Sequence, residues 1–283
     1  MQEEKTLSAC LKDAVSALQT LSPTPAMDAK MILKHVLDCS DADLITKWDM
    51  PIAREDRARI EELVRRRCEK EPVAYLIGKK GFLDYEFAVG EGVLIPRPDT
   101  ELLVQTLAER IGDADRLGLE IGLGSGCISI SLLKLCPGLR LRASEVSEAA
   151  LAYAEQNIAA LGVGDRIDAF LADLIDEKSR RYDFIVSNPP YIAEQDYARL
   201  MPDVKDYEPK GALHGGEDGL DYYRRILELA DGILKEDGFV AFEIGYDQAD
   251  ALRSLLAEHS YDKVEVFQDL AGKDRVVIGV KHD

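Results

Sequence analysis

From residue 98 onward, short apolar runs alternate with amphipathic segments, and this alternation constrains the fold more than any other feature of the sequence. Segments with the helical spacing of apolar residues, such as 147–161 and 221–234, separate the runs. Strands that alternate with helices predict a parallel, doubly wound α/β sheet. The runs expected to be strands are 117–121, 139–144, 167–172, 182–187 and 239–244.

The end of the chain departs from this pattern. Residues 264–267 and 275–280 are both strand-like, and only residues 268–274 separate them. A gap of this length is too short for a helical crossover, so the last two strands are expected to be antiparallel. A parallel sheet with an antiparallel strand near its end is similar to the Rossmann-like layout of class I methyltransferases, more than to a plain dinucleotide-binding fold.

The first part of the chain has a different character and predicts separate domains. Residues 1–73 hold three segments with helical spacing of leucine, isoleucine and valine, which predicts a small helical bundle. Residues 74–95 predict a connector with a β-hairpin, because aromatic and branched residues lie there around two glycines. Residues 96–283 form the predicted α/β domain.

Composition limits the classes of partner and compartment. The net charge of −18 repels phosphate backbones, so tight nucleic-acid binding is not expected. The five cysteines include no C-x-x-C pair and the four histidines are scattered, so we expect no metal site. An acidic N-terminus and the lack of a run of about 20 apolar residues argue against a signal peptide and a membrane helix. We therefore expect a cytoplasmic protein with reduced thiols.

A glycine-rich loop follows the first predicted strand of the α/β domain. The stretch is Glu120-Ile121-Gly122-Leu123-Gly124-Ser125-Gly126, and a predicted helix follows it. Glycines let the chain turn tightly and let a ligand approach the backbone, next to the free N–H groups of a helix start. Both nicotinamide cofactors and S-adenosylmethionine bind at such a turn, so this loop alone leaves the cofactor open.

Two carboxylates follow the next two predicted strands. Glu145 ends the second strand, about 20 residues after the glycine loop, where an acidic residue can accept hydrogen bonds from both ribose hydroxyls. Asp173 ends the third strand, where its carboxylate can accept a hydrogen bond from an adenine amino group, with Leu174 against the ring. These residues complete a predicted cofactor site at the carboxyl ends of three strands.

The fourth strand ends at Ser187 and is followed by Asn188-Pro189-Pro190-Tyr191. In the doubly wound order this strand lies about 4.8 Å from the first, so the tetrapeptide should reach the glycine loop. The Asn188 side-chain oxygen and the Pro189 carbonyl can hold the two N–H groups of a planar amide or amine, and point its nitrogen at a methyl donor. Both prolines have fixed φ angles and no N–H, and the Tyr191 ring can cover the planar group.

The same motifs carry a resemblance to a known family over nearly the whole chain. Asn188 to Tyr191 together with the glycine loop is shared by S-adenosylmethionine-dependent methyltransferases that act on planar nitrogens. The segment Ile95-Pro96-Arg97-Pro98-Asp99-Thr100-Glu101 is its most specific signature, and Glu71 to Gly78, Tyr207-Glu208-Pro209 and Asp274-Arg275-Val276 agree as well. The chain resembles the protein-(glutamine-N5) methyltransferases that modify class-1 peptide chain release factors.

The resemblance implies both a substrate and site roles. The substrate is the glutamine of the Gly-Gly-Gln motif, methylated on its side-chain amide nitrogen with release of S-adenosylhomocysteine, and residues 1–73 help to hold the release factor. Asn188 also belongs to the implied cofactor site, and Arg97 to the implied substrate site. Where the family often has an aromatic residue after the acidic one, this chain has Leu174. The alternatives are a glutamine methyltransferase of a ribosomal protein, a DNA adenine methyltransferase and, from another class, a nicotinamide-dependent oxidoreductase.

Overall fold

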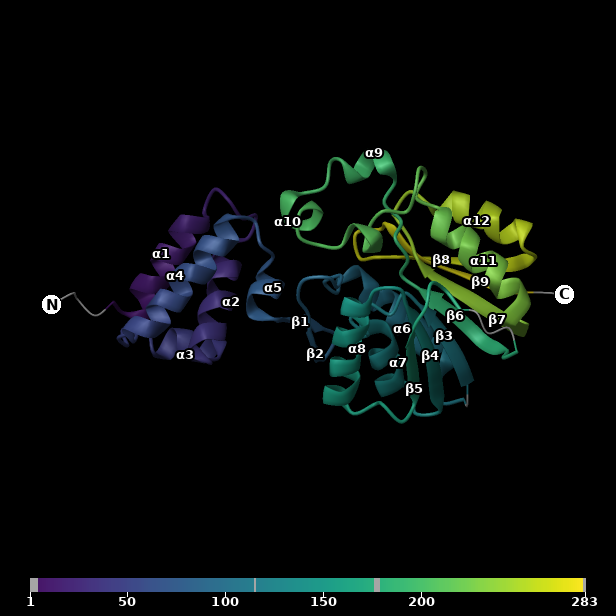
Figure 1. Cartoon of the computed structure of the whole chain (residues 1–283), viewed down its shortest axis with the longest axis horizontal. Coiled ribbons are helices and arrows are strands. Elements are labelled where there is room, and N and C mark those ends of the chain that lie inside the picture. The colour runs from purple at the N-terminus through teal and green to yellow at the C-terminus, as the bar shows by residue number, and fades with distance from the viewer. Residues whose placement is uncertain (1–4, 115, 176–178, 282–283) are drawn as a thin grey trace. The chain divides into compact units, whose positions relative to one another are not determined.

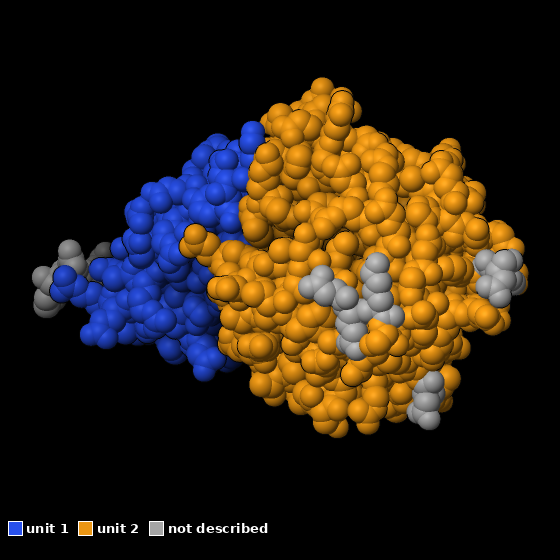
Figure 2. All heavy atoms as spheres, turned by 45° about the vertical axis from the view of Figure 1, so that its right-hand side comes forward, with its two compact units in different colours: residues 1–79, 201–207 blue, residues 80–200, 208–283 orange. Residues whose placement is uncertain are grey.

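The computed structural model describes residues 5–114, 116–175 and 179–281, and its contacts divide the chain into two units. The smaller unit comprises residues 1–79 together with 201–207, and the larger comprises 80–200 and 208–283 (Figure 2). The sequence predicts the bundle to end at residue 73, whereas the contacts place the division after Lys79. In the described part of the chain, no helix is both long and apolar enough to cross a membrane.

The smaller unit is a bundle of helices around one apolar core (Figure 1). Each predicted helix forms, because leucine, isoleucine and alanine side chains recur on one face and pack together. The two short helices α3 and α5 were not predicted. The elements are α1 (Leu7–Leu18), α2 (Pro25–Leu37), α3 (Asp41–Thr46), α4 (Arg54–Cys68) and α5 (Val73–Ile77), and α10 (Pro202–Lys205) joins them from far along the chain.

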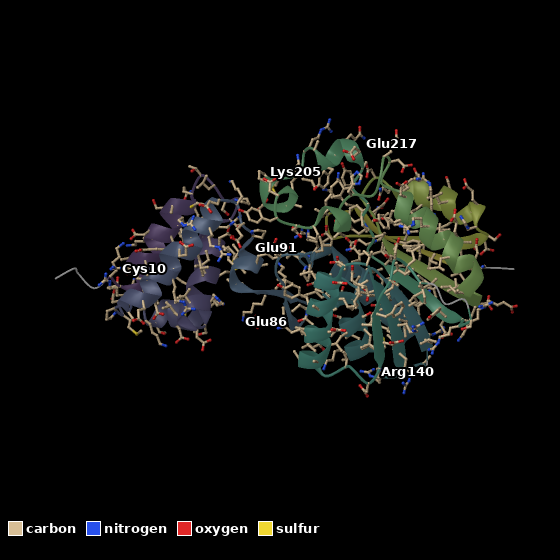
Figure 3. The ribbon with its side chains drawn as sticks, viewed as in Figure 1. Cys10, Glu86, Glu91, Arg140, Lys205 and Glu217 are labelled. Atoms are coloured by element: carbon tan, nitrogen blue, oxygen red, sulfur yellow. The ribbon has the colours of Figure 1, made fainter. Side chains whose placement is uncertain are left out.

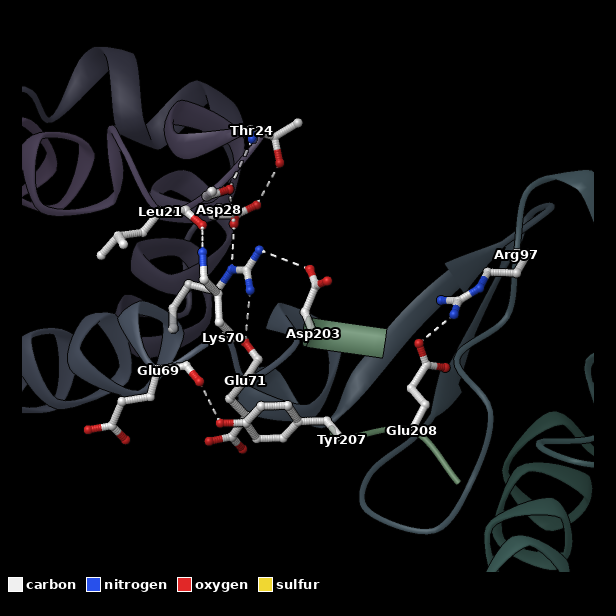
Figure 4. A network of polar contacts seen from close by, with 12 residues as sticks. Leu21, Thr24, Asp28, Glu69, Lys70, Glu71, Arg97, Asp203, Tyr207 and Glu208 are labelled. Atoms are coloured by element: carbon white, nitrogen blue, oxygen red, sulfur yellow. Dashed lines mark hydrogen bonds and ion pairs between the residues drawn. The ribbon is translucent and has the colours of Figure 1, made fainter. Parts of the chain in front are cut away.

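A buried ion pair inside this unit joins its helices. Arg67 of α4 donates through Nε to Asp28 of α2 at 2.7 Å, and the two side chains are only 5% and 7% exposed. Asp203 of α10 lies 3.5 Å from the same guanidinium, and the Tyr207 hydroxyl donates to the Glu69 carbonyl at 2.7 Å (Figure 4). These contacts attach residues 201–207 to the helices of the smaller unit.

The larger unit contains a seven-stranded sheet with the order β5-β4-β3-β6-β7-β9-β8. Strand β9 is antiparallel to both of its neighbours, and the other pairings are parallel, which confirms the predicted class I methyltransferase layout. The strands are β3 (Arg116–Ile121), β4 (Leu139–Glu145), β5 (Ile167–Leu171), β6 (Tyr182–Ser187), β7 (Leu234–Glu243), β8 (Tyr261–Gln268) and β9 (Asp274–Lys281).

Helices cover both faces of this sheet (Figure 1). Leucine, isoleucine and valine side chains of α6 and α7 share one core with the sheet, and those of α11 and α12 share the other. Both faces of the central strands are therefore buried, which explains their continuous apolar runs. The helices are α6 (Asp99–Ile111), α7 (Cys127–Leu135), α8 (Glu148–Leu161), α9 (Glu194–Tyr197), α11 (Asp221–Ile233) and α12 (Ala249–Glu258), with a 3₁₀ turn at Lys210–Ala212.

The predicted hairpin forms from β1 (Lys79–Phe82) and β2 (Tyr85–Ala88). Its Phe82 and Phe87 rings lie in the sheet core, and Asn157 of α8 bonds both backbone groups of Ala88, accepting at 2.7 Å and donating at 3.1 Å. The hairpin is thus part of the larger unit's core. The surface carries the charge: Glu86, Glu91, Arg140 and Glu217 are all exposed (Figure 3).

Candidate active site

The glycine loop lies between β3 and α7 and forms one wall of a cavity in the larger unit. Gly122 and Gly124 line the cavity and have φ angles of 78° and 57°, which residues with a side chain rarely adopt. A Cβ atom at either position would meet no protein atom within 4 Å. The two glycines therefore leave space that a ligand can occupy against the backbone.

Glu145, at the end of β4, borders the same cavity and holds the glycine loop. Its Oε2 accepts a hydrogen bond from Gly124 N at 2.7 Å, and its Oε1 accepts one from Ser147 N at 2.9 Å. A carboxylate has about four acceptor positions, so each oxygen keeps one for a further donor. The side chain is placed where the sequence predicts a partner for the ribose hydroxyls.

The third part of the wall comes from the segment after β5. Asp173 and Leu174 line the cavity, and the Asp173 carboxylate pairs with Arg225 of α11 at 2.8 Å. The guanidinium of Arg225 also lies 5.5 Å from the centre of the Tyr222 ring, another cavity residue. Leu174 has a φ angle of 66°, so its backbone is strained where the cavity needs a sharp turn.

The Asn-Pro-Pro-Tyr segment meets the glycine loop as predicted. Strand β6 pairs with β3, and the Ser187 hydroxyl donates to the Ile121 carbonyl at 2.7 Å. Asn188, Pro189 and Pro190 line the same cavity as the glycines. The Asn188 side chain donates through Nδ2 to the Thr100 hydroxyl at 3.2 Å.

Tyr191 lies beside this cavity with its backbone and hydroxyl both held. Gln248 donates through Nε2 to the Tyr191 carbonyl at 3.0 Å. A Cβ atom at Gly219 would lie 2.4 Å from that carbonyl, and Gly219 has a φ angle of 79°, so the position requires glycine. The phenol donates to Glu243 at 3.4 Å, and burial raises its pKa.

Four residues of the predicted cofactor set lie behind the cavity wall: Leu123, Ser125, Gly126 and Glu120. Glu120 is fully buried, and its Oε2 accepts a hydrogen bond from Ser129 N at 3.0 Å and another from the Ser129 hydroxyl. Its Oε1 has no partner in the described part of the chain. Burial, which outweighs the Ser129 hydrogen bonds, raises the pKa of Glu120 to about 8. Through Ser129, the buried Glu120 carboxyl thus holds the first turn of α7 in place.

We expect Glu120→Gln to flatten the pH dependence of stability. Between pH 4.5 and about 8 the unfolded chain loses the Glu120 proton while the folded chain keeps it, so the free energy of unfolding falls as pH rises. One such group contributes at most about 1.4 kcal/mol per pH unit. Denaturant titrations of the protein alone across this range should show a shallower fall for the variant. Glu91→Gln, at an exposed position, is the control and should show the same fall as the wild type. If Glu120→Gln also shows the wild-type fall, the raised pKa of Glu120 is contradicted.

Arg97 forms an ion pair with Glu208, whose side chain is only 1% exposed (Figure 4). Glu208 also accepts a hydrogen bond from Ile95 N at 3.0 Å. These two contacts of Glu208, with Arg97 and with Ile95, form a clamp. Leu94, which precedes Ile95, and Pro209, which follows Glu208, line the cavity. In this structure the guanidinium thus fixes the cavity wall, and contact with a substrate stays a prediction.

We expect Glu208→Ala to destabilise the larger unit by about 1–3 kcal/mol, because it leaves the buried N–H of Ile95 without an acceptor. Chemical denaturation followed by circular dichroism measures the change. Glu217→Ala, at an exposed position, is the matched control and should be neutral. Equal stability of the two variants rules out the clamp.

Thr100 lies inside the first turn of α6, which begins at Asp99, and it is 2% exposed. Pro98 already has helical backbone angles, so it sets the start of this helix. The Thr100 hydroxyl contacts Asn188, while Asp99 pairs with Arg275 at 3.0 Å.

Several cavity residues were not predicted. Val146 directly follows Glu145, and only the structure shows that it is 65% exposed and lines the cavity. Tyr222 comes from α11, and Gly92 and Ala212 come from segments without regular periodicity. These last three residues lie far apart in the chain, so no local pattern reveals that they line one cavity.

Comparisons with known proteins agree with this arrangement. Residues 9–78 match the family model of the PrmC N-terminal domain, and residues 97–203 match the methyltransferase small domain. The release factor glutamine methyltransferase of Clostridium acetobutylicum is 37% identical over 90% of each chain. That of Agrobacterium fabrum is 36% identical over 97% of each chain.

Solved structures add a likeness of fold alone. The ribosomal protein L11 methylase of Lactobacillus delbrueckii subsp. bulgaricus is 21% identical, with a TM-score of 0.51 over 69% of this chain and 84% of that one. A methyltransferase from Pyrococcus furiosus is 20% identical, with a TM-score of 0.54 over 72% and 92%. The relatives found by sequence show the family as well as the fold. On their identity and coverage, this chain belongs to the family of release factor glutamine methyltransferases.

Proposed function

We propose that this protein methylates the side-chain amide nitrogen of the glutamine in the Gly-Gly-Gln motif of class-1 peptide chain release factors. The methyl donor is S-adenosylmethionine, whose use the methyltransferase family implies, and the product is S-adenosylhomocysteine. One observation carries the proposal: Asn188, Pro189 and Pro190 line the same cavity as the glycine loop and Glu145. The residues proposed to hold the acceptor nitrogen thus lie beside the residues proposed to hold the nucleoside part of the cofactor.

The residues present fit this cofactor. Gly122 and Gly124 leave open space against the backbone, and Glu145 keeps acceptor capacity toward the cavity. Leu174 and Tyr222 offer apolar surface for a base, and Asp173 lies beside them. When bound, S-adenosylmethionine supplies a methyl group on a sulfonium, which is already activated for transfer, so we propose that no metal takes part.

Asn188 and Pro189 are the proposed catalytic groups for the acceptor. An amide nitrogen is a poor nucleophile because its lone pair is delocalised. The Asn188 Oδ1 and the Pro189 carbonyl would accept its two N–H hydrogens, which favours a pyramidal nitrogen with its lone pair directed at the methyl carbon. Pro190 keeps the backbone without a competing N–H, and Tyr191 would cover the amide plane. The rate gain comes from positioning and electrostatics rather than from a general base.

The remaining predictions concern the setting of the reaction. We propose that residues 1–73 help to hold the release factor, that the chain works in the cytoplasm, and that it binds neither membranes nor nucleic acid tightly. The net charge of −18 supports the last point, because an acidic surface repels phosphates. Arg97 remains a candidate contact to the substrate protein, next to its clamp with Glu208.

The test is methylation with labelled S-adenosylmethionine of three acceptors: a class-1 release factor, a ribosomal protein and duplex DNA. Label should appear on the release factor alone, and a release factor with the motif glutamine changed to alanine should stay unlabelled. Label on the ribosomal protein or on DNA, with none on the release factor, overturns the proposed substrate.

A further inference from the structure

Glu243 is a buried carboxyl at the end of β7, next to the residues that line the cavity, and it is only 1% exposed. The Tyr191 phenol donates to its Oε1 at 3.4 Å. Its Oε2 has no well-formed hydrogen bond in the described part of the chain. The other hydroxyl that acts on this carboxyl is that of Thr100, whose hydrogen bonding lowers the pKa of Glu243. A buried, incompletely paired carboxyl in a folded protein is uncommon and calls for an explanation.

Thr100 stands between this carboxyl and Asn188, because its hydroxyl accepts from Asn188 Nδ2 at 3.2 Å and is also close enough to Glu243 to lower the pKa of that carboxyl. A carboxylate can only accept hydrogen bonds, and a hydroxyl has a single proton to donate. If Thr100 gives that proton to Glu243, it offers only lone pairs to Asn188, and the observed contact is indeed from Nδ2 to the Thr100 Oγ1 at 3.2 Å. The opposite amide orientation would place two acceptors face to face. The hydrogen-bond network is what distinguishes the two orientations of an amide.

We propose that Glu243 is a positioning residue that acts through Thr100 and Tyr191. Its carboxylate sets which way the Asn188 amide faces, so that Oδ1 is free for the acceptor amide, and it holds the Tyr191 ring by the phenol. This inference rests on the proposed function, because it assumes that Asn188 binds the acceptor amide.

The surroundings make the carboxyl sensitive to pH. Burial, with a smaller contribution from Asp99 of α6, outweighs the lowering by Thr100, Tyr191 and Arg275 of β9, so that the pKa of Glu243 is raised to about 7. The other ionisable neighbours are Tyr223 of α11, whose hydroxyl donates to the Glu243 carbonyl at 2.7 Å, and Cys127 of α7, whose thiol pKa is raised chiefly by burial and also by Glu243. Protonated Glu243 can donate to Thr100, which removes the directional constraint on Asn188.

The first test is Glu243→Gln, which keeps the shape but adds donors to the side chain. We expect kcat for release-factor methylation to fall roughly tenfold or more, with the KM for S-adenosylmethionine within about twofold, because the loss concerns orientation in the transition state. Wild-type activity should rise with pH through about 7, and this limb should be missing in the variant. Glu236→Gln, at an exposed position of the same strand, is the matched control.

The second test does not depend on how the Gln variant folds. Thr100→Val keeps the volume and removes the hydroxyl, whereas Thr100→Ser keeps the hydroxyl. Valine should lower kcat as Glu243→Gln does, and serine should restore it to within a few-fold of the wild type. Near-normal kcat for both Glu243→Gln and Thr100→Val, alongside an impaired Asn188→Ala, overturns the inference and leaves the proposed function standing. A near-normal Asn188→Ala instead refutes the proposed role of Asn188 itself.

Discussion

Asn188→Ala should slow methyl transfer by roughly 10²–10³-fold, the usual effect of removing one preorganised polar contact to the reacting group. The side chain lies in the cavity wall with Nδ2 on Thr100, and Oδ1 is the atom proposed to bind the acceptor amide. Alanine removes that acceptor but leaves the glycine loop and Glu145 in place. The affinity for S-adenosylmethionine should therefore stay nearly unchanged, and single-turnover assays with calorimetric titration measure both quantities.

Asn157 provides a contrasting control, because it is the only other asparagine in the chain. It is 2% exposed and bonds Ser125 and Ala88 with no place in the cavity wall. Asn157→Ala should lower the melting temperature, whereas Asn188→Ala should leave it within a few degrees of the wild type. A near-normal transfer rate in Asn188→Ala removes the proposed catalytic role.

The sheet of the larger unit could be predicted because its information is local. Each central strand is buried on both faces and appears as an apolar run, and the short gap between the last two strands excludes a crossover. The predicted strand β7 begins at residue 239, but the structure begins it at Leu234. Lys235 to Asp237 are exposed and polar there, so apolar periodicity does not detect this part of the strand.

The site could be predicted only where it follows the ends of strands. Glu145 and Asn188 each follow a strand end, so the doubly wound order alone brings them to one edge of the sheet. Glu243 also ends a strand at this edge, but no local pattern shows that its carboxyl is buried. Glu208 lies at no strand end. Glu208 meets Arg97 across 111 positions, and Thr100 meets Asn188 across 88, so their pairing depends on the finished tertiary structure.

The end of the cavity proposed for adenine is lined by Leu174 and by Tyr222 of α11. The resemblance noted in the sequence implies an aromatic residue at position 174, where this chain has leucine. Arg225 then joins the two sides, since it pairs with Asp173 and lies over the Tyr222 ring. An aromatic surface is thus present, although it comes from a different element.

Glu145→Ala should weaken S-adenosylmethionine binding by roughly 10²-fold or more, while kcat at saturating cofactor stays within a few-fold of the wild type. Two hydrogen bonds from ribose hydroxyls to a charged acceptor contribute about 1.5–3 kcal/mol each. The substitution also frees Gly124 N and Ser147 N, so the glycine loop loses its brace. Calorimetric titration with S-adenosylmethionine measures the dissociation constant directly.

Glu148→Ala tests whether the effect belongs to the carboxylate at position 145 or to the negative charge of the region. Glu148 lies in the first turn of α8, is exposed and does not line the cavity. If Glu145 acts by direct contact, Glu148→Ala keeps the wild-type affinity, and Glu145→Gln falls between alanine and the wild type because it retains one acceptor oxygen. Equal losses at positions 145 and 148 point to a general electrostatic effect, and unchanged affinity in Glu145→Ala removes this residue from the cofactor site.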